Sequence, residues 1–217
     1  SETGTSYYNV FVDGKLHKVV KVCGTDTLIH LVSGIDKRIH SLKIQKRSEG
    51  EFGKTTVHQF VLSGSGRLAE EPAVRTRHIE FIGNSLTCGY GTDGKHRDEP
   101  FLVETENCNL TFASMLARYY DADYTLIAHS GRGAARNYGD SVRVSKVTMK
   151  DRMLNTFDED LTHKWNFKEY RPDLVVINLG SNDFSTEPHP YKSEFTKAYK
   201  QILAQLREHY GDIPILC

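Results

Sequence analysis

The sequence predicts an α/β protein in which a parallel sheet, layered between helices, follows a smaller all-β domain. Residues 7–62 contain consecutive short strands spaced about ten residues apart, with no helix among them. From about residue 78, apolar strands alternate with helices, a pattern that builds a parallel sheet covered on both faces. The linker-like run at 64–72, Gly-Ser-Gly-Arg-Leu-Ala-Glu-Glu-Pro, separates domains expected at 1–70 and 75–217.

The composition restricts the class of protein. A chain of 217 residues with 38% hydrophobic content can build two cores. The formal net charge is +0 and basic residues are scattered, so no nucleic-acid partner and no anionic membrane is expected. No apolar run approaches the roughly 18 residues of a membrane-spanning helix. The four cysteines form no Cys-x-x-Cys pair, so no structural zinc or other cofactor is expected, and a Cys88–Cys108 disulfide stays open.

The first domain is expected to be an antiparallel β-sandwich. Its strands are expected at Tyr7–Val12, Leu16–Val22, Thr27–Val32, Ile39–Lys46 and Thr55–Leu62. Leu42 and Ile44 alternate with Lys43 and Gln45, so these strands should bury one face only. Five strands are fewer than the roughly seven of a complete sandwich, so this end of the chain is expected to be truncated.

The second domain is expected to alternate strands and helices. Its elements are expected at His78–Ile82, Asn109–Tyr120, Tyr124–Ala128, a mixed segment at 142–168, Leu174–Leu179, a helix at about 191–206, and Ile213–Leu216. The apolar helix faces are expected to contain Phe112, Leu116 and Tyr119 in the first helix, and Tyr191, Phe195, Tyr199, Ile202 and Leu206 in the second. Because no helix follows the last strand, truncation is expected at this end too.

Three polar segments each follow an apolar strand of this domain. They are Phe-Ile-Gly-Asn-Ser-Leu-Thr at 81–87, Ser-Gly-Arg-Gly at 130–133 and Gly-Ser-Asn-Asp at 180–183. The carboxyl ends of parallel strands share one edge of the sheet, where open α/β sheets bind their ligands. Ser85 offers a hydroxyl nucleophile, Gly131 a backbone N–H donor and Asn182 an amide donor. Together these groups indicate ester hydrolysis.

Each candidate residue also has a purely structural explanation. Ser85 could cap the turn after its strand, Gly131 could permit a tight turn, and Asn182 could hold its loop through an Asx turn. The residues around Ser85 are not the Gly-x-Ser-x-Gly elbow of α/β-hydrolases. Only the ordered set of three segments favours the catalytic interpretation.

The ordered set resembles the GDSL/SGNH hydrolases. Gly83-Asn84-Ser85-Leu86 is similar to their nucleophile block, with Asn in place of the usual Asp. Gly131 is similar to the second-block glycine, and the segment 180–183 to the Gly-x-Asn-Asp block. The runs at 130–139 and 165–180, with a sandwich ahead of them, resemble carbohydrate esterase family 2 over nearly the whole chain. Members of that family remove O-acetyl groups from xylan, glucomannan and related sugars.

The resemblance implies a flavodoxin-like, three-layer α/β/α SGNH hydrolase domain behind a jelly-roll-like sandwich. It implies an acyl-enzyme on Ser85 and an oxyanion hole made by the backbone N–H groups of Ser85 and Gly131 and the side chain of Asn182. Tyr138 is similar in position to an aromatic sugar platform, an ordinary core tyrosine being the alternative. The implied partner is an acetylated oligo- or polysaccharide, and the implied location is secreted or periplasmic.

The three segments do not supply a general base for Ser85. In this superfamily the catalytic histidine lies in an Asp-x-x-His-type block after the last strand, so it is expected beyond Cys217 and this chain alone is expected to be inactive. His129 and His189 lie nearest the motifs, and each is expected to be structural or a substrate contact. Two alternatives stay open: a carbohydrate-binding protein with a vestigial site, and an SGNH lipase or thioesterase, against which the polar run at 130–140 argues.

Overall fold

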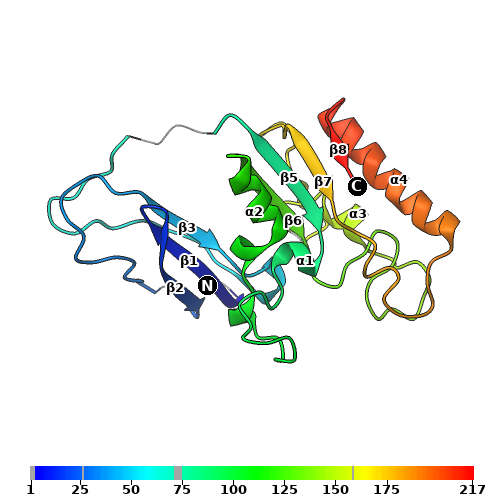
Figure 1. Cartoon of the computed structure of the whole chain (residues 1–217), viewed down its shortest axis with the longest axis horizontal. Helices are drawn as coiled ribbons and strands as arrows, with labels where there is room; N and C mark the ends of the chain where they lie inside the picture. Colours follow the sequence, from blue (N-terminus) through cyan, green and yellow to red (C-terminus); the bar gives the residue numbers. More distant parts are fainter. Residues whose placement is uncertain (1–2, 26, 71–74, 158) are drawn as a thin grey trace. The chain divides into compact units, whose positions relative to one another are not determined.

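The computed structural model describes residues 3–25, 27–70, 75–157 and 159–217. It divides into two compact units, Ser1–Val74 and Arg75–Cys217 (Figure 1). Among the described residues, no helix is both long and apolar enough to cross a membrane.

The first unit is built on one antiparallel sheet of order β2–β1–β3, with β4 pairing the start of β1. Its elements are β1 (Thr3–Val12), β2 (Lys15–Cys23), β3 (Leu42–Lys46), the 3-10 turn η1 (Gly50–Phe52) and β4 (Gly53–Lys54). Asp13 and Gly14 join β1 to β2 with φ of 50° and 76°. Positive φ at both positions is the type I′ geometry that matches strand twist.

Two of the expected strands are absent from this unit. Residues 27–32 and 55–62 are described and are not strands. Leu28 is 86% exposed and Phe60 is 60% exposed, so neither segment buries the apolar side chains that suggested a strand. Strand propensity is realised only where a neighbouring strand and a core accept the side chains. The described sheet is therefore smaller than the expected five-stranded sandwich.

The second unit contains a parallel sheet of order β6–β5–β7–β8 (Figure 1). Its strands are β5 (His78–Gly83), β6 (Asp123–Ala128), β7 (Leu174–Ile177) and β8 (Ile215–Leu216). This is the flavodoxin-like order, with the first strand between the second and the third. Gly83 pairs with Ala128 and Ile82 with Ile177, so three strands end level at one edge, called here the carboxyl edge.

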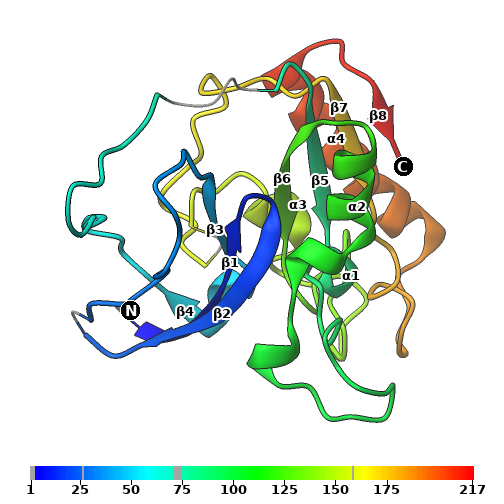
Figure 2. The same cartoon turned by 60° about the vertical axis from the view of Figure 1, so that its left-hand side comes forward.

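Helices cover both faces of this sheet and complete the three-layer α/β/α fold that the sequence predicted. The short helix α1 (Ser85–Cys88) follows β5, α2 (Phe112–Tyr119) covers one face, and α3 (Met149–Arg152) and α4 (Lys192–Tyr210) cover the other (Figure 2). Phe81 packs with Ala113 and Ala117 of α2. Ile82, its neighbour in the strand, packs with Ile202 and Leu206 of α4. Alternate side chains of β5 thus supply two separate cores.

The buried face of α2 differs from the expected one. Ala113, Ser114 and Ala117 are buried, whereas Leu116 is 42% exposed and Tyr119 is 81% exposed. The helix begins after Thr111, whose hydroxyl accepts from the N–H of Ser114 at 3.4 Å. Phe112 packs against this core as expected, but small side chains let the rest of the short helix lie close to the sheet, so Leu116 and Tyr119 point outward.

The other expectations for this unit have mixed outcomes. Ile202 and Leu206 of α4 are buried as expected, while Tyr191 precedes the helix and is 59% exposed. The mixed segment contains α3 and a β-bridge between Asn155 and Lys164. Cys88 and Cys108 are both free, so they form no disulfide.

Candidate active site

The turn after β5 presents Ser85 at the carboxyl edge. A Cβ on Gly83 would lie 2.0 Å from the Thr87 hydroxyl, so only glycine allows this close turn. Asn84 caps α1 through its side-chain oxygen, which accepts from the N–H of Leu86 at 3.2 Å. Ser85 is the first residue of α1 and is partly exposed. Its hydroxyl is therefore accessible on a turn that buried neighbours hold in place.

The loop after β6 contains two glycines with different constraints. Gly131 adopts φ of 74°, and its carbonyl accepts from the N–H of Tyr138 at 2.8 Å. A Cβ on Gly133 would lie 2.0 Å from the carbonyl oxygen of Arg136 and 2.4 Å from Asp183 Oδ2. Glycine is thus required at 131 by backbone conformation and at 133 by space.

The loop after β7 supplies Asn182 and Asp183, which are 8% and 0% exposed. The Asn182 amide donates to the carbonyl of Arg132 at 2.8 Å. The Asp183 carboxylate accepts from the backbone N–H groups of Ala134, Ala135 and Arg136. Both side chains therefore bind the loop that follows β6.

Hydrogen bonds join all three loops at the carboxyl edge. Asn84 Nδ2 donates to the Ser181 hydroxyl at 2.9 Å, which links the Ser85 turn to the loop after β7. Asn182 links that loop in turn to the one after β6. The strand order reverses between β5 and β7, the place where flavodoxin-like sheets bind ligands. The three polar segments of the sequence thus meet at the topological switch point.

Comparison with known proteins identifies the architecture. The GDSL-like lipase/acylhydrolase family matches residues 81–217, and the carbohydrate esterase 2 N-terminal family matches residues 1–72. The chain belongs to carbohydrate esterase family 2, within the GDSL-like hydrolases.

Two curated proteins are similar to this family 2 chain. It is 36% identical over 214 residues to the cellulase/esterase CelE of Acetivibrio thermocellus, covering 99% of this chain and 26% of that protein. It is 33% identical over 182 residues to an acetylxylan esterase/glucomannan deacetylase of Cellvibrio japonicus, covering 82% and 49%.

Solved family 2 structures give the same result. A family two carbohydrate esterase from Clostridium thermocellum, in complex with cellohexaose, matches with a TM-score of 0.87 and 34% identity, covering 98% of this chain and 63% of that one. A family 2 enzyme from Corynascus matches with a TM-score of 0.86 and 26% identity, covering 98% and 65%. The chain spans less than two thirds of the length of these relatives.

Tyr138 of the family 2 chain is a surface residue. Its side chain is 63% exposed, which excludes the alternative of an ordinary core tyrosine. Arg136, fully buried, donates to the carbonyls of Val142, Asp140 and Glu187, and so braces the loop that carries Tyr138 against the loop after β7. An exposed ring on a braced loop suits stacking against a sugar.

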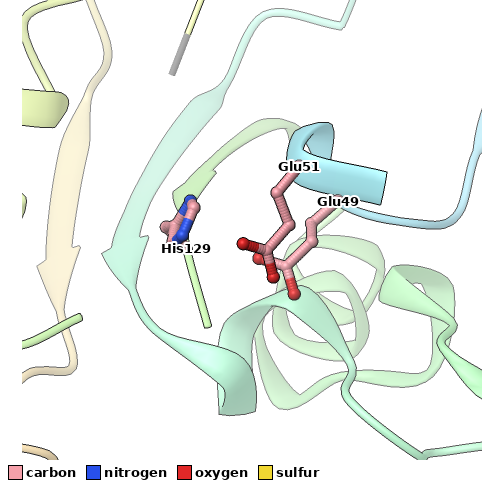
Figure 3. Close-up of side chains that lie close together, drawn as sticks. All are labelled: Glu49, Glu51 and His129. Carbon is pink, nitrogen blue, oxygen red and sulfur yellow. The ribbon is translucent and has the colours of Figure 1, made fainter. Parts of the chain in front are cut away.

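The two histidines nearest the motifs have different environments. His129 follows β6 and is 1% exposed (Figure 3). His189 lies beyond Asn182, with its Nδ1 3.4 Å from a Glu187 carboxylate oxygen. Within the described ranges of the chain, the Ser85 hydroxyl forms no hydrogen bond with a histidine. Neither His129 nor His189 is therefore arranged as the base for Ser85.

A buried carboxyl group lies within β5, and the sequence analysis did not predict it. Glu80 of β5 is fully buried and accepts hydrogen bonds from the hydroxyls of Tyr170 and Tyr210, both at 2.8 Å. Burial raises the pKa of Glu80, and the two hydroxyls oppose the rise in part. The sequence feature that could have indicated Glu80 is an acidic residue inside an otherwise apolar strand.

In the first unit, Glu49 precedes η1 and Glu51 lies within it, with carboxylate oxygens within 4.8 Å of each other (Figure 3).

Proposed function

We propose that the protein containing this chain is a serine esterase that removes O-acetyl groups from carbohydrates through an acyl-enzyme on Ser85. The observation that carries the proposal is the hydrogen-bonded junction of the three loops. Asn84 and Asn182 together tie the loops that carry Ser85, Gly131 and Asn182. The names of the relatives support carbohydrate deacetylation in particular.

In the proposed reaction, the Ser85 hydroxyl attacks the carbonyl carbon of the acetyl ester and gives its proton to a general base. The tetrahedral oxyanion accepts hydrogen bonds from the backbone N–H groups of Ser85 and Gly131 and from the side chain of Asn182. Collapse returns the proton to the sugar oxygen and leaves acetyl-Ser85. Water then hydrolyses this ester to acetate.

The geometry of Asn182 suits this role. A side-chain amide has two N–H groups, and one of them donates to the carbonyl of Arg132. That bond fixes the plane of the amide and leaves the second N–H for the oxyanion. A donor held before the reaction begins needs no reorganisation in the transition state.

We further propose that the general base is a histidine outside this chain. The chain covers 63% of the Clostridium thermocellum structure, and no described histidine bonds to Ser85. A serine hydroxyl without a base keeps its oxyanion hole but reacts several orders of magnitude more slowly.

For the substrate, we propose an acetylated oligo- or polysaccharide that stacks on Tyr138. The ring of Tyr138 is exposed, and the C–H face of a pyranose is apolar enough to cover it. Because such polymers lie outside the cell, a secreted or periplasmic location accompanies this proposal.

The test compares three forms of the full-length protein on 4-nitrophenyl acetate and on acetylated xylan. Ser85→Ala should lose at least about 1000-fold in kcat/KM. Ser193→Ala, an exposed serine on α4, should match the unmodified protein. Turnover that persists in Ser85→Ala would refute the assignment. Binding of xylan without any turnover would favour a carbohydrate-binding protein, and a preference for long-chain acyl esters would favour a lipase.

A further inference from the structure

We propose that Asp183 is a positioning residue that holds the oxyanion hole of the proposed esterase in shape. The inference rests on the proposed function and extends it. The segment 180–183 contains Asp183 beside Asn182, but the proposed reaction uses only Asn182. The structure gives Asp183 a separate task.

The Asp183 carboxylate is enclosed by a backbone turn. It is 0% exposed and accepts three N–H bonds, from Ala134 at 3.0 Å, Ala135 at 2.6 Å and Arg136 at 2.8 Å. The carbonyl and carboxylate oxygens leave no room for a Cβ on Gly133. The backbone of the turn therefore packs directly against the Asp183 carboxylate.

The charge of Asp183 is balanced by backbone groups. Over the ranges that the structure describes, no lysine, arginine or histidine forms an ion pair with this carboxylate. A buried charge is tolerated only when hydrogen bonds replace its hydration, and N–H bonds to an ionised acceptor are stronger than neutral ones. An asparagine would offer one acceptor oxygen and would point its own N–H groups at N–H donors. Asn and Asp are therefore not equivalent at this position.

The turn that Asp183 holds follows Gly131, whose N–H is one of the proposed oxyanion donors. Gly131 and Arg132 lie three and two residues before Ala134, the first residue whose N–H the carboxylate binds. Asn182, the neighbour of Asp183, binds the same turn at the Arg132 carbonyl. The loop after β7 thus binds the turn after β6 at two points, through the Asn182 amide and through the Asp183 carboxylate. These two attachments fix the position of the Gly131 N–H relative to the Asn182 amide.

The direct test is Asp183→Asn in the full-length protein, assayed on 4-nitrophenyl acetate. We expect kcat to fall by about 10- to 100-fold with little change in KM, because donors displaced by a fraction of an ångström still admit substrate but fit the oxyanion poorly. The matched control is Asp173→Asn. Asp173 also accepts a backbone N–H, from His78 at 2.8 Å, but lies before β7 at the opposite edge of the sheet. It should keep the kcat of the unmodified protein.

A double-mutant cycle with Asn182→Ala separates positioning from general stability. If Asp183 acts through the oxyanion hole, its loss should matter much less once Asn182 is gone, so the two effects on kcat should not add. Additive effects, or an Asp183→Asn variant with full kcat, would overturn the proposal while leaving the esterase function standing. If the unmodified protein shows no Ser85-dependent turnover, both the role of Asp183 and the esterase function are overturned.

If Asp183→Asn does not fold, amide hydrogen exchange on the unmodified protein tests whether Asp183 holds the turn. The N–H groups of Ala134, Ala135 and Arg136 should exchange slowly, as groups buried against a carboxylate do. Exchange at the rate of exposed loop amides would show that the carboxylate does not hold the turn and would sink the inference.

Discussion

The side-chain amide of Asn182 donates to the backbone carbonyl of Arg132 at 2.8 Å, so the loops after β6 and β7 are joined at the edge where Ser85 lies. The same amide is the proposed oxyanion donor. Its orientation and its catalytic use are therefore linked, and its replacement should affect both.

Asn182→Asp should lower kcat by about 100- to 1000-fold, the usual cost of one oxyanion donor. The carboxylate cannot donate, and it would face the Arg132 carbonyl as a second acceptor. Steady-state kinetics on 4-nitrophenyl acetate measure the loss. Asn155→Asp provides the control, since Asn155 lies in the bridge with Lys164, away from the three loops. Equal activity in the two variants would contradict the role of Asn182.

Gly131→Ala should lower both stability and kcat, whereas Gly139→Ala should lower stability alone. The two glycines have almost the same φ, 74° and 73°, so an alanine is strained by about 1–2 kcal/mol at either position. A Cβ meets nothing within 4 Å at Gly139. Thermal unfolding should give similar shifts for both variants. A similar kcat for both would argue against the Gly131 N–H as an oxyanion donor.

Tyr138→Ala should raise KM for acetylated oligosaccharides several-fold and leave KM for 4-nitrophenyl acetate unchanged. The side chain is 63% exposed, so its removal should hardly change the free energy of unfolding. Tyr119→Ala on α2, where the side chain is 81% exposed, is the control and should leave both KM values as they are. Equal KM changes for the two substrates would remove Tyr138 from the sugar site.

Glu80→Gln should make the free energy of unfolding less sensitive to a rise in pH above about 4.5. Burial raises the pKa of Glu80 in the folded state above its ordinary value of 4.5, so the folded protein holds this proton more tightly than the unfolded chain. The free energy of unfolding therefore falls as the pH rises from about 4.5 through the raised pKa, and this contribution disappears in the glutamine variant.

Urea unfolding at a series of pH values measures the difference. Glu208→Gln on α4 changes an exposed carboxyl and should keep the pH dependence of the unmodified protein. An unchanged slope in Glu80→Gln would show that Glu80 does not titrate in this range.

Much of the hydrolase unit could be read from the sequence. The apolar runs that became β5, β6 and β7 are each followed directly by glycine or polar residues, so the ends of these strands could be predicted from the local sequence. The 3.6-residue spacing of Ile202 and Leu206 likewise predicted the buried face of α4. The order of the three polar segments along these strands was enough to predict that they meet at one edge.

Tertiary structure decided the features that depend on partners distant in the chain. The apolar residues at 27–32 and 55–62 gained no neighbouring strand, and the closeness of α2 to the sheet favoured Ala113 and Ala117 over Leu116. Tyr138 is exposed on a loop that Arg136 holds by donating to the carbonyl of Val142. The hydrogen bonds between Asp183 and the turn at 134–136 join residues more than 45 positions apart, so no local sequence pattern predicts them. Local sequence periodicity determined the helices and strands and the positions of the candidate residues along them. The orientation of these residues was decided by long-range hydrogen bonds and packing, because such contacts form only when both partner segments are in place.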